Sequence, residues 1–145
     1  MRLVTLSGAP AEGFVFQQDD SILALMKDLP NTDGSVELLD CKIDKDKDGS
    51  DMLRVYFRFT NNTGEETSFF MAYDIYAMQD GYGLSTAYPA TELQEDQNFT
   101  EDIAPGGSIE CAATYVIRTD SPVAILLKDS WDWDAEVFGD IVKFE

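Results

Sequence analysis

Residues 52–66 read MLRVYFRFTNNTGEE, and this stretch decides the fold class. From Leu53 to Thr60, leucine, valine and phenylalanine fall on one face, and arginine, tyrosine and threonine fall on the other. A period of two with β-branched and aromatic residues is typical of a strand with one face in the core. Residues 61–64 then tolerate turn geometry and end the strand. The stretch therefore predicts a half-buried strand with Arg54 and Arg58 on its solvent face.

Similar patterns occur on both sides of this strand. Further strands are predicted over 36–43, 67–78, 108–118, 122–128 and 140–144, with shorter extended pieces at 3–6, 14–16 and 84–88. Only the loop 44–51 separates 36–43 from the strand at Leu53, so these two strands should form an antiparallel hairpin. About seven strands without alternating helices predict a mainly all-β fold, an antiparallel β-sandwich.

A single short helix is predicted near the N-terminus. Ile22, Leu25, Met26 and Leu29 recur at helical spacing, after a capping Asp20 or Ser21 and before Pro30. The chain is therefore divided into an N-terminal extension over 1–35, whose helix packs on the core, and the sandwich over 36–145. Residues 90–104 show no periodicity and predict an acidic connection.

The charge of the chain excludes several functions. It has 28 acidic residues against 10 basic ones and no histidine, for a net charge of −18, and no Lys or Arg occurs between Arg58 and Arg118. Such a field repels nucleic acid, so no direct nucleic-acid binding is expected, whereas basic proteins, polyamines or divalent cations are attracted. No run approaches the ~20 apolar residues of a membrane span. The N-terminus has no apolar segment of an intact signal peptide, which indicates a cytosolic protein or a trimmed exported one.

Catalysis is not expected. Without histidine there is no Ser-His or Cys-His pair and no imidazole ligand for zinc, and two cysteines are too few for a thiolate metal site. Cys41 and Cys111 both lie in predicted strands, where they should be buried thiols. A disulfide between them is the alternative if the chain is exported.

The loop before the Leu53 strand resembles half of a calcium site. Aspartates at its first, third and fifth positions and glycine at its sixth match the first half of an EF-hand loop, but valine replaces the glutamate at position twelve. The predicted ligands of a weak calcium site, the one cofactor considered, are Asp44, Asp46, Asp48 and Ser50. Asp-Gly is also what a hairpin connection favours.

A second motif near the C-terminus interleaves tryptophans with acids. Its candidate partner-binding residues are Trp131, Asp132, Trp133 and Asp134, and Glu95 and Asp96 of the acidic connection are further candidates. Exposed indoles ringed by carboxylates could stack on a sugar or a cation, or form the centre of a protein interface. In the alternative interpretation one tryptophan caps the core while the acids face water.

Four segments follow one another in the order found in a known domain family: FTNNTGEETSFF (59–70), AMQDGYGL (77–84), IAPGGSIECAATYVI (103–117) and SPVAILLKD (121–129). From about Val36 to the C-terminus the chain resembles an immunoglobulin-like domain of unknown function, common in secreted proteins and lipoproteins of Gram-positive bacteria. The resemblance implies an immunoglobulin-like sandwich, an extracellular or cell-surface location, and an accessory or binding module without catalytic residues.

Two functions are therefore considered. The first is a non-enzymatic binding or accessory module that engages a protein or glycan partner, which the resemblance favours. The alternative is an acidic inhibitor that mimics nucleic acid, as some phage-encoded anti-defence proteins do, and blocks a basic nucleic-acid-binding enzyme. The net charge of −18 and the long base-free interval favour this alternative.

Overall fold

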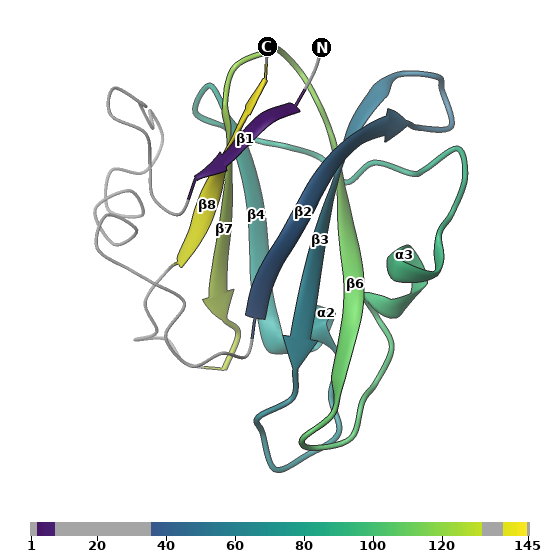
Figure 1. Ribbon diagram of the computed structural model, residues 1–145, viewed down its shortest axis with the longest axis vertical. Helices are drawn as coiled ribbons and strands as arrows, with labels where there is room; N and C mark the ends of the chain where they lie inside the picture. The colour runs from purple at the N-terminus through teal and green to yellow at the C-terminus, as the bar shows by residue number, and fades with distance from the viewer. Residues whose placement is uncertain (1–2, 8–35, 132–137, 145) are drawn as a thin grey trace.

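The computed structural model describes residues 3–7, 36–131 and 138–144, which form two antiparallel sheets (Figure 1). One sheet has the strand order β1-β8-β7-β4-β5 and the other has the order β2-β3-β6. The strands are β1 (Leu3–Ser7), β2 (Val36–Lys45), β3 (Asp51–Thr60), β4 (Tyr73–Gln79), β5 (Tyr82–Gly83), β6 (Ser108–Val116), β7 (Val123–Asp129) and β8 (Phe138–Phe144). Two short helices are α2 (Phe69–Ala72) and α3 (Gln94–Asn98). The prediction of a mostly β, antiparallel fold is confirmed.

Strand β3 is the centre of its sheet, as its alternation predicts. It pairs with β2 as the expected hairpin, with Ile43 opposite Leu53, and on its other edge with β6. The inward residues of β3 are fully or almost fully buried, namely Leu53, Val55, Phe57 and Phe59. Burying such apolar side chains contributes about 1.5–3 kcal/mol each, which is why this face specifies the register of the strand.

Both sheets contribute to one hydrophobic cluster. The three-stranded sheet supplies the inward face of β3 with Val36, Cys41, Cys111, Ala113 and Tyr115, and the other sheet supplies Tyr73, Ala77, Val123, Ile125, Leu127 and Val142. Among the described helices, none has the length and apolar character to cross a bilayer.

The two cysteines are buried thiols that form no disulfide. Cys41 lies in β2 and Cys111 in β6, and β3 runs between these strands. Two strand spacings of about 4.8 Å separate their backbones by more than the ~7 Å that a disulfide can bridge. The buried-thiol interpretation is therefore confirmed and the disulfide alternative has no support in this geometry.

The predicted strand over 67–78 is wrong in its first half. Ser68 caps a helical turn there, because its Oγ accepts a hydrogen bond from the N–H of Met71 at 3.2 Å, and α2 follows before β4 begins at Tyr73. The predicted connection 90–104 also contains a helical turn, α3. The strand predicted at 3–6, within the N-terminal extension, is confirmed as β1, which pairs with β8. The predicted helix at 20–29 and the piece at 14–16 lie outside the described residues.

Candidate functional site

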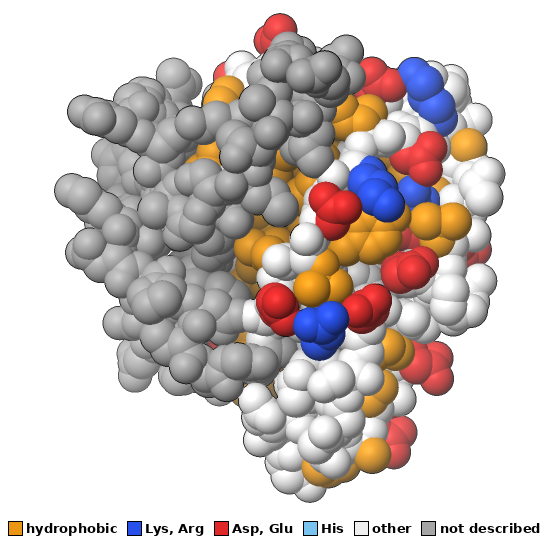
Figure 2. All heavy atoms as spheres, viewed as in Figure 1, with side chains coloured by type: hydrophobic (Ala, Val, Ile, Leu, Met, Phe, Trp, Pro, Cys, Tyr) orange, Lys and Arg blue, Asp and Glu red, His pale blue; other side chains and the backbone are white. Residues whose placement is uncertain are grey.

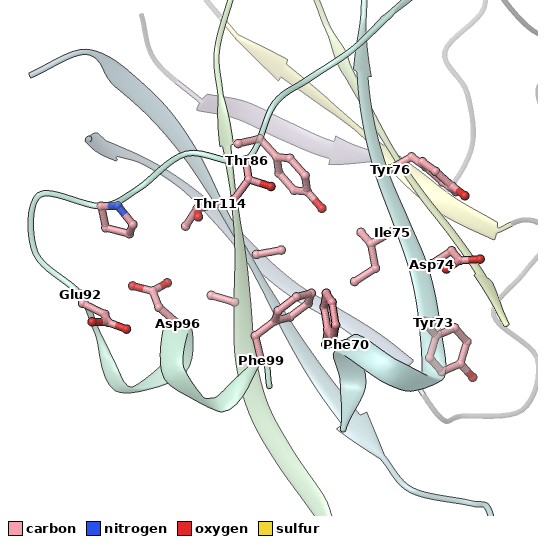
Figure 3. Close-up of a pocket in the computed structure, with 14 residues that line it drawn as sticks. Phe70, Tyr73, Asp74, Ile75, Tyr76, Thr86, Glu92, Asp96, Phe99 and Thr114 are labelled. Atoms are coloured by element: carbon pink, nitrogen blue, oxygen red, sulfur yellow. The ribbon is translucent and has the colours of Figure 1, made fainter. Parts of the chain in front are cut away.

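A groove with a volume of about 450 Å³ lies between β4 of one sheet and β6 of the other (Figure 3). Its apolar lining comes from Phe70, Tyr73, Ile75, Tyr76, Pro89, Phe99, Ala112, Ala113 and Tyr115, and its polar lining from Asp74, Thr86, Glu92, Asp96 and Thr114. None of these described lining residues is Lys or Arg. The size is within the usual range of ligand pockets, roughly 300–1,000 Å³.

The groove is open because neither bordering strand has a full-length neighbour on that side. Strand β5 pairs only with the last two residues of β4. The chain after β5 follows the edge of β6 briefly, where the N–H of Ala87 donates to the carbonyl of Thr114 at 3.0 Å. It then crosses to the hairpin turn that follows β2, where the N–H of Lys47 donates to the carbonyl of Tyr88 at 2.9 Å. Beyond this crossing, the edges of β4 and β6 face the groove without a neighbouring strand among the described residues.

A chain of aromatic rings connects the groove to the core. Phe99 packs edge-on against Phe69, with ring centroids 5.6 Å apart, and against Phe70 at 5.7 Å. Phe69 is fully buried and also contacts Phe57 at 5.0 Å, whereas Phe70 is 55% exposed. Figure 3 shows Ile75 extending from β4 toward the rings of Phe70 and Phe99. The helical turn α2 therefore sends one phenylalanine into the core and the next into the groove.

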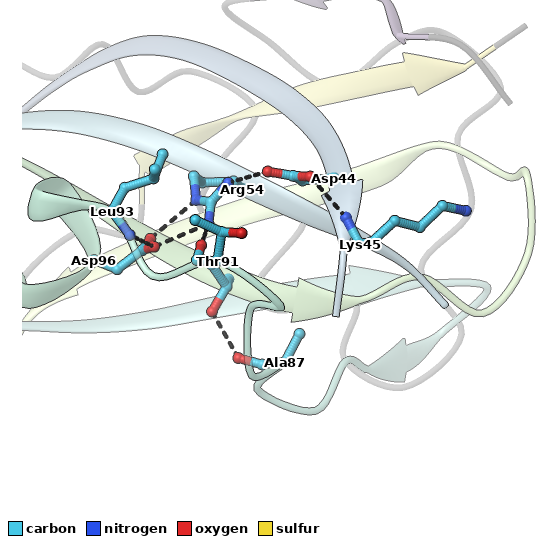
Figure 4. Close-up of polar contacts among 8 residues, drawn as sticks. Asp44, Lys45, Arg54, Ala87, Thr91, Leu93 and Asp96 are labelled. Atoms are coloured by element: carbon cyan, nitrogen blue, oxygen red, sulfur yellow. Dashed lines mark hydrogen bonds and ion pairs between the residues drawn. The ribbon is translucent and has the colours of Figure 1, made fainter. Parts of the chain in front are cut away.

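The prediction that Arg54 faces solvent is wrong, because only 1% of this residue is exposed. Its Nε and Nη2 donate to the two carboxylate oxygens of Asp96 at 3.0 and 2.9 Å, and its Nη1 donates to Asp44 at 2.6 Å (Figure 4). Nη2 also donates to the carbonyl of Thr91 at 3.1 Å. Burial alone would lower the pKa of Arg54, but the hydrogen bonds to Asp96 and Asp44 raise this pKa above its ordinary value.

This network holds the wall of the groove formed by α3. Asp96 uses its Oδ2 both for Arg54 and for the N–H of Leu93, 2.9 Å away at the start of α3. At the other end of the helix, Nδ2 of Asn98 donates to the carbonyl of Glu110 in β6 at 2.9 Å. Asp96, a candidate partner contact, thus lines the groove with its carboxylate already paired, and Glu95 lies beside it on the same helical turn.

Arg58, a second base of this sheet, also lies among acids. Figure 2 shows blue side chains on this face flanked by red ones. Arg58 forms ion pairs with Glu37 at 2.7 Å and with Glu110 at 2.9 Å on the exposed surface. Such exposed pairs are screened by salt and stabilise little, in contrast to the buried Arg54.

Two carboxylates of the predicted calcium loop, those of Asp44 and Asp46, are engaged in other contacts. Asp44, near the end of β2, forms an ion pair with Arg54. In the hairpin turn that follows, Oδ1 of Asp46 accepts the N–H groups of Asp48 and Ser50, both at 2.9 Å. The pKa of Asp44 is lowered by the N–H of Lys45 and then by Arg54. The described residues bring together no group of three or more His, Cys, Asp or Glu side chains suited to a metal. The calcium site stays a prediction.

Trp131 lies beside a second concavity on the other side of α2. It is 72% exposed, so it is not a tryptophan that caps the core. The concavity, with a volume of about 890 Å³, is lined by Met71 and by acids that include Glu65, Glu66 and Asp102. The other three candidates of this motif, Asp132, Trp133 and Asp134, lie outside the described residues.

The sequence patterns missed the groove, because it depends on which strand edges remain without a neighbour. The burial of Arg54 was missed as well. No local signal marks it, because Arg58 lies on the same face of the same strand and its side chain is 42% exposed.

By its fold, the protein belongs to the mostly β class and is built from two antiparallel sheets. The model of the family described as a domain of unknown function, DUF5067, matches residues 18–129, and the protein belongs to this family. A solved structure of a candidate lipoprotein from Staphylococcus aureus subsp. aureus NCTC 8325 is similar, with a TM-score of 0.59 and 16% identity, over 74% of this chain and 81% of that chain. At this identity the likeness shows the fold alone. No curated protein matches the chain.

Proposed function

We propose that the protein is a non-enzymatic binding module that holds a positively charged segment of a partner protein in the groove between β4 and β6. One observation carries this proposal: aromatic and acidic side chains line the groove, and none of its described lining residues is basic. Exposed Asp74 and Glu92 supply the negative charge, and Phe70 offers an exposed ring. An apolar surface beside exposed acids is complementary to a segment that is both apolar and basic.

The ring geometry favours a protein over a glycan. Sugars stack on the flat face of an exposed aromatic ring, but Phe70 and Phe99 meet edge-on at an interplanar angle of 69°. Such a pair forms a narrow apolar corner that suits an aliphatic or aromatic side chain. The net charge of −18 would also speed the encounter with a basic partner through long-range attraction.

In this proposal the two sheets form an immunoglobulin-like sandwich, displayed outside the cell or on its surface in a Gram-positive bacterium. The single hydrophobic cluster shared by both sheets supports the sandwich. The fold shared with a candidate lipoprotein supports the location. Protease treatment of intact host cells tests it: the protein should be degraded while a cytosolic marker survives, and survival of both would contradict the location.

Calorimetric titration with defined probes tests the binding function. The probes are a short peptide of alternating valine and lysine, the same peptide with glutamate for lysine, and a chito-oligosaccharide. We expect heat from the lysine peptide alone, an affinity that falls with added salt, and a loss of about ten-fold or more in the variant Phe70→Ser. The matched control is Tyr88→Ser, which removes an exposed ring outside the groove and should bind as the wild type does.

Each other outcome has a distinct meaning. Equal binding of the two peptides, or binding of neither, would contradict the proposal. Binding of the oligosaccharide that depends on Phe70 would favour the glycan alternative. Lysine-peptide binding that salt abolishes but Phe70→Ser leaves unchanged would mean that net charge alone acts, as expected for the nucleic-acid mimic.

A further inference from the structure

The backbone of β6 has one residue whose polar groups face the groove. The N–H of Val116 donates to the carbonyl of Ser85 at 2.8 Å, and the carbonyl of Thr114 accepts from Ala87, so these two residues of β6 direct their backbone groups away from β3. The backbone groups of an antiparallel strand alternate in direction from one residue to the next. Ala112 therefore directs its N–H and its C=O to the same side as Thr114 and Val116.

Other segments of the chain occupy this edge on both sides of Ala112. Segment 85–87 pairs with one side, and the side-chain amide of Asn98 reaches the carbonyl of Glu110 on the other. Ala112 itself has no hydrogen-bond partner on this side among the described residues, although it is only 3% exposed and lines the groove. A buried N–H and C=O without partners are costly, and they are a site where an incoming backbone is strongly favoured.

We propose that the groove takes its ligand by strand addition over a single residue: an extended, basic segment of a partner protein pairs with β6 at Ala112 and leaves the edge on either side, where segment 85–87 and Asn98 already lie. One residue of this segment accepts the N–H of Ala112 and donates its own N–H to the C=O of Ala112. Because side chains alternate along a strand, apolar residues of the segment face Phe70 and Ile75 while basic residues face Glu92. This inference rests on the proposed function and specifies how that function is performed.

Strand β4 borders the same groove, but its backbone is a weaker pairing site for a partner segment. The carbonyl of Ala77 accepts the N–H of Leu84 at 2.7 Å, so by the same alternation Ile75 also directs its backbone toward the groove. Ile75 is only half-buried, however, and solvent can satisfy its backbone groups in the free protein. The buried Ala112 gains more from a partner, which assigns the pairing to β6.

Nuclear magnetic resonance of the complex with the valine–lysine peptide tests the pairing directly. With a carbon-13 label on the peptide carbonyls, the account predicts a scalar coupling through the hydrogen bond between the amide nitrogen of Ala112 and one peptide carbonyl. The amide of Ala113, which faces β3, is the internal control and should show no coupling to the peptide. Coupling to Ile75 in place of Ala112, or to neither, would overturn the assignment to β6.

Modified peptides provide a second measurement that leaves the protein unchanged. Methylation of the peptide nitrogen that faces Ala112 should lower the affinity about ten-fold, whereas methylation of the next nitrogen, which faces away, should change it little. The variant Ala112→Pro removes the outward N–H without breaking a hydrogen bond to β3, and it should weaken binding as well. If the peptide binds the groove with equal affinity whichever nitrogen is methylated, strand addition fails while the proposed binding function stands. If no peptide binds, the proposed function itself fails.

Discussion

Arg54 and Asp96 lie 42 residues apart in sequence, and the guanidinium of one meets both carboxylate oxygens of the other, at 3.0 and 2.9 Å. The pair is buried beneath α3, on the face of β3 that faces away from the core between the sheets. A bidentate bond of this kind fixes orientation as well as distance. The start of the helix, and with it the wall of the groove that carries Glu92, is therefore held on the sheet by Arg54, while Asn98 holds the other end.

The first prediction concerns this pair. Asp96→Ala should lower the free energy of unfolding by about 3 kcal/mol, because it leaves a buried guanidinium with only part of its partners. Urea denaturation measures the change. The matched control is Glu110→Ala, which removes one partner from Arg58 on the exposed part of the same sheet face and should have little effect. Equal losses in both variants would contradict the role of burial.

The second prediction separates two adjacent phenylalanines. Phe69→Ala should destabilise the protein by about 3–5 kcal/mol, because it empties a buried site between β3 and β4. Phe70→Ala removes a largely exposed ring and should leave the thermal midpoint nearly unchanged while weakening peptide binding. Thermal unfolding and calorimetric titration of both variants check this. A large loss of stability from Phe70→Ala would show that its ring is structural.

The third prediction is an acid limit on stability. The folded-state pKa of Asp44 lies below its ordinary value of 3.8, because the N–H of Lys45 and then Arg54 stabilise its charged form. A carboxyl with a lowered pKa stabilises the fold fully above its unfolded-state pKa, and this contribution is lost as pH falls through the folded-state value. Urea denaturation should show stability falling below about pH 4. Asp44→Asn should reduce this pH dependence, and an unchanged profile would contradict it.

The fourth prediction concerns the thiols. Burial raises the pKa of Cys111 to about 12. With Cys41 buried as well, the native protein should not react with a thiol reagent at pH 8, a usual working pH for such reagents and about half a unit below the ordinary cysteine pKa. Both thiols should react once the protein is unfolded in denaturant without reductant. Failure to label either thiol in denaturant would indicate a disulfide.

The fifth prediction tests the hairpin loop. Asp46→Ala should cost about 1–2 kcal/mol, because two backbone N–H groups lose their acceptor, while Asp46→Asn keeps the oxygen and should cost less. Asp48→Ala, at an exposed position, is the control. Calorimetry with millimolar Ca²⁺ on the same variants tests the calcium hypothesis: heat that Asp46→Ala abolishes would support it, and no heat from the wild type would remove it.

Alternation along single strands was enough to predict β3, its hairpin with β2, and the antiparallel class. It failed at Phe69–Ala72, because FFMAYDIYAM is apolar on both faces and so fits a strand as well as a helical turn. The cap that settles this is Ser68, whose effect depends on one hydrogen bond. Arg54 and the groove could not be predicted, because both depend on contacts between segments about 40 residues apart.

The most direct measurement for the central claim is amide chemical-shift mapping of the nitrogen-15-labelled protein during titration with the valine–lysine peptide. We expect the largest shifts at the two walls of the groove, at Ile75, Phe99, Ala112 and Thr114, and we expect the glutamate peptide to cause none of them. Shifts centred on Trp131 and Glu66, or no shifts at saturating peptide, would contradict the assignment of the groove as the binding site.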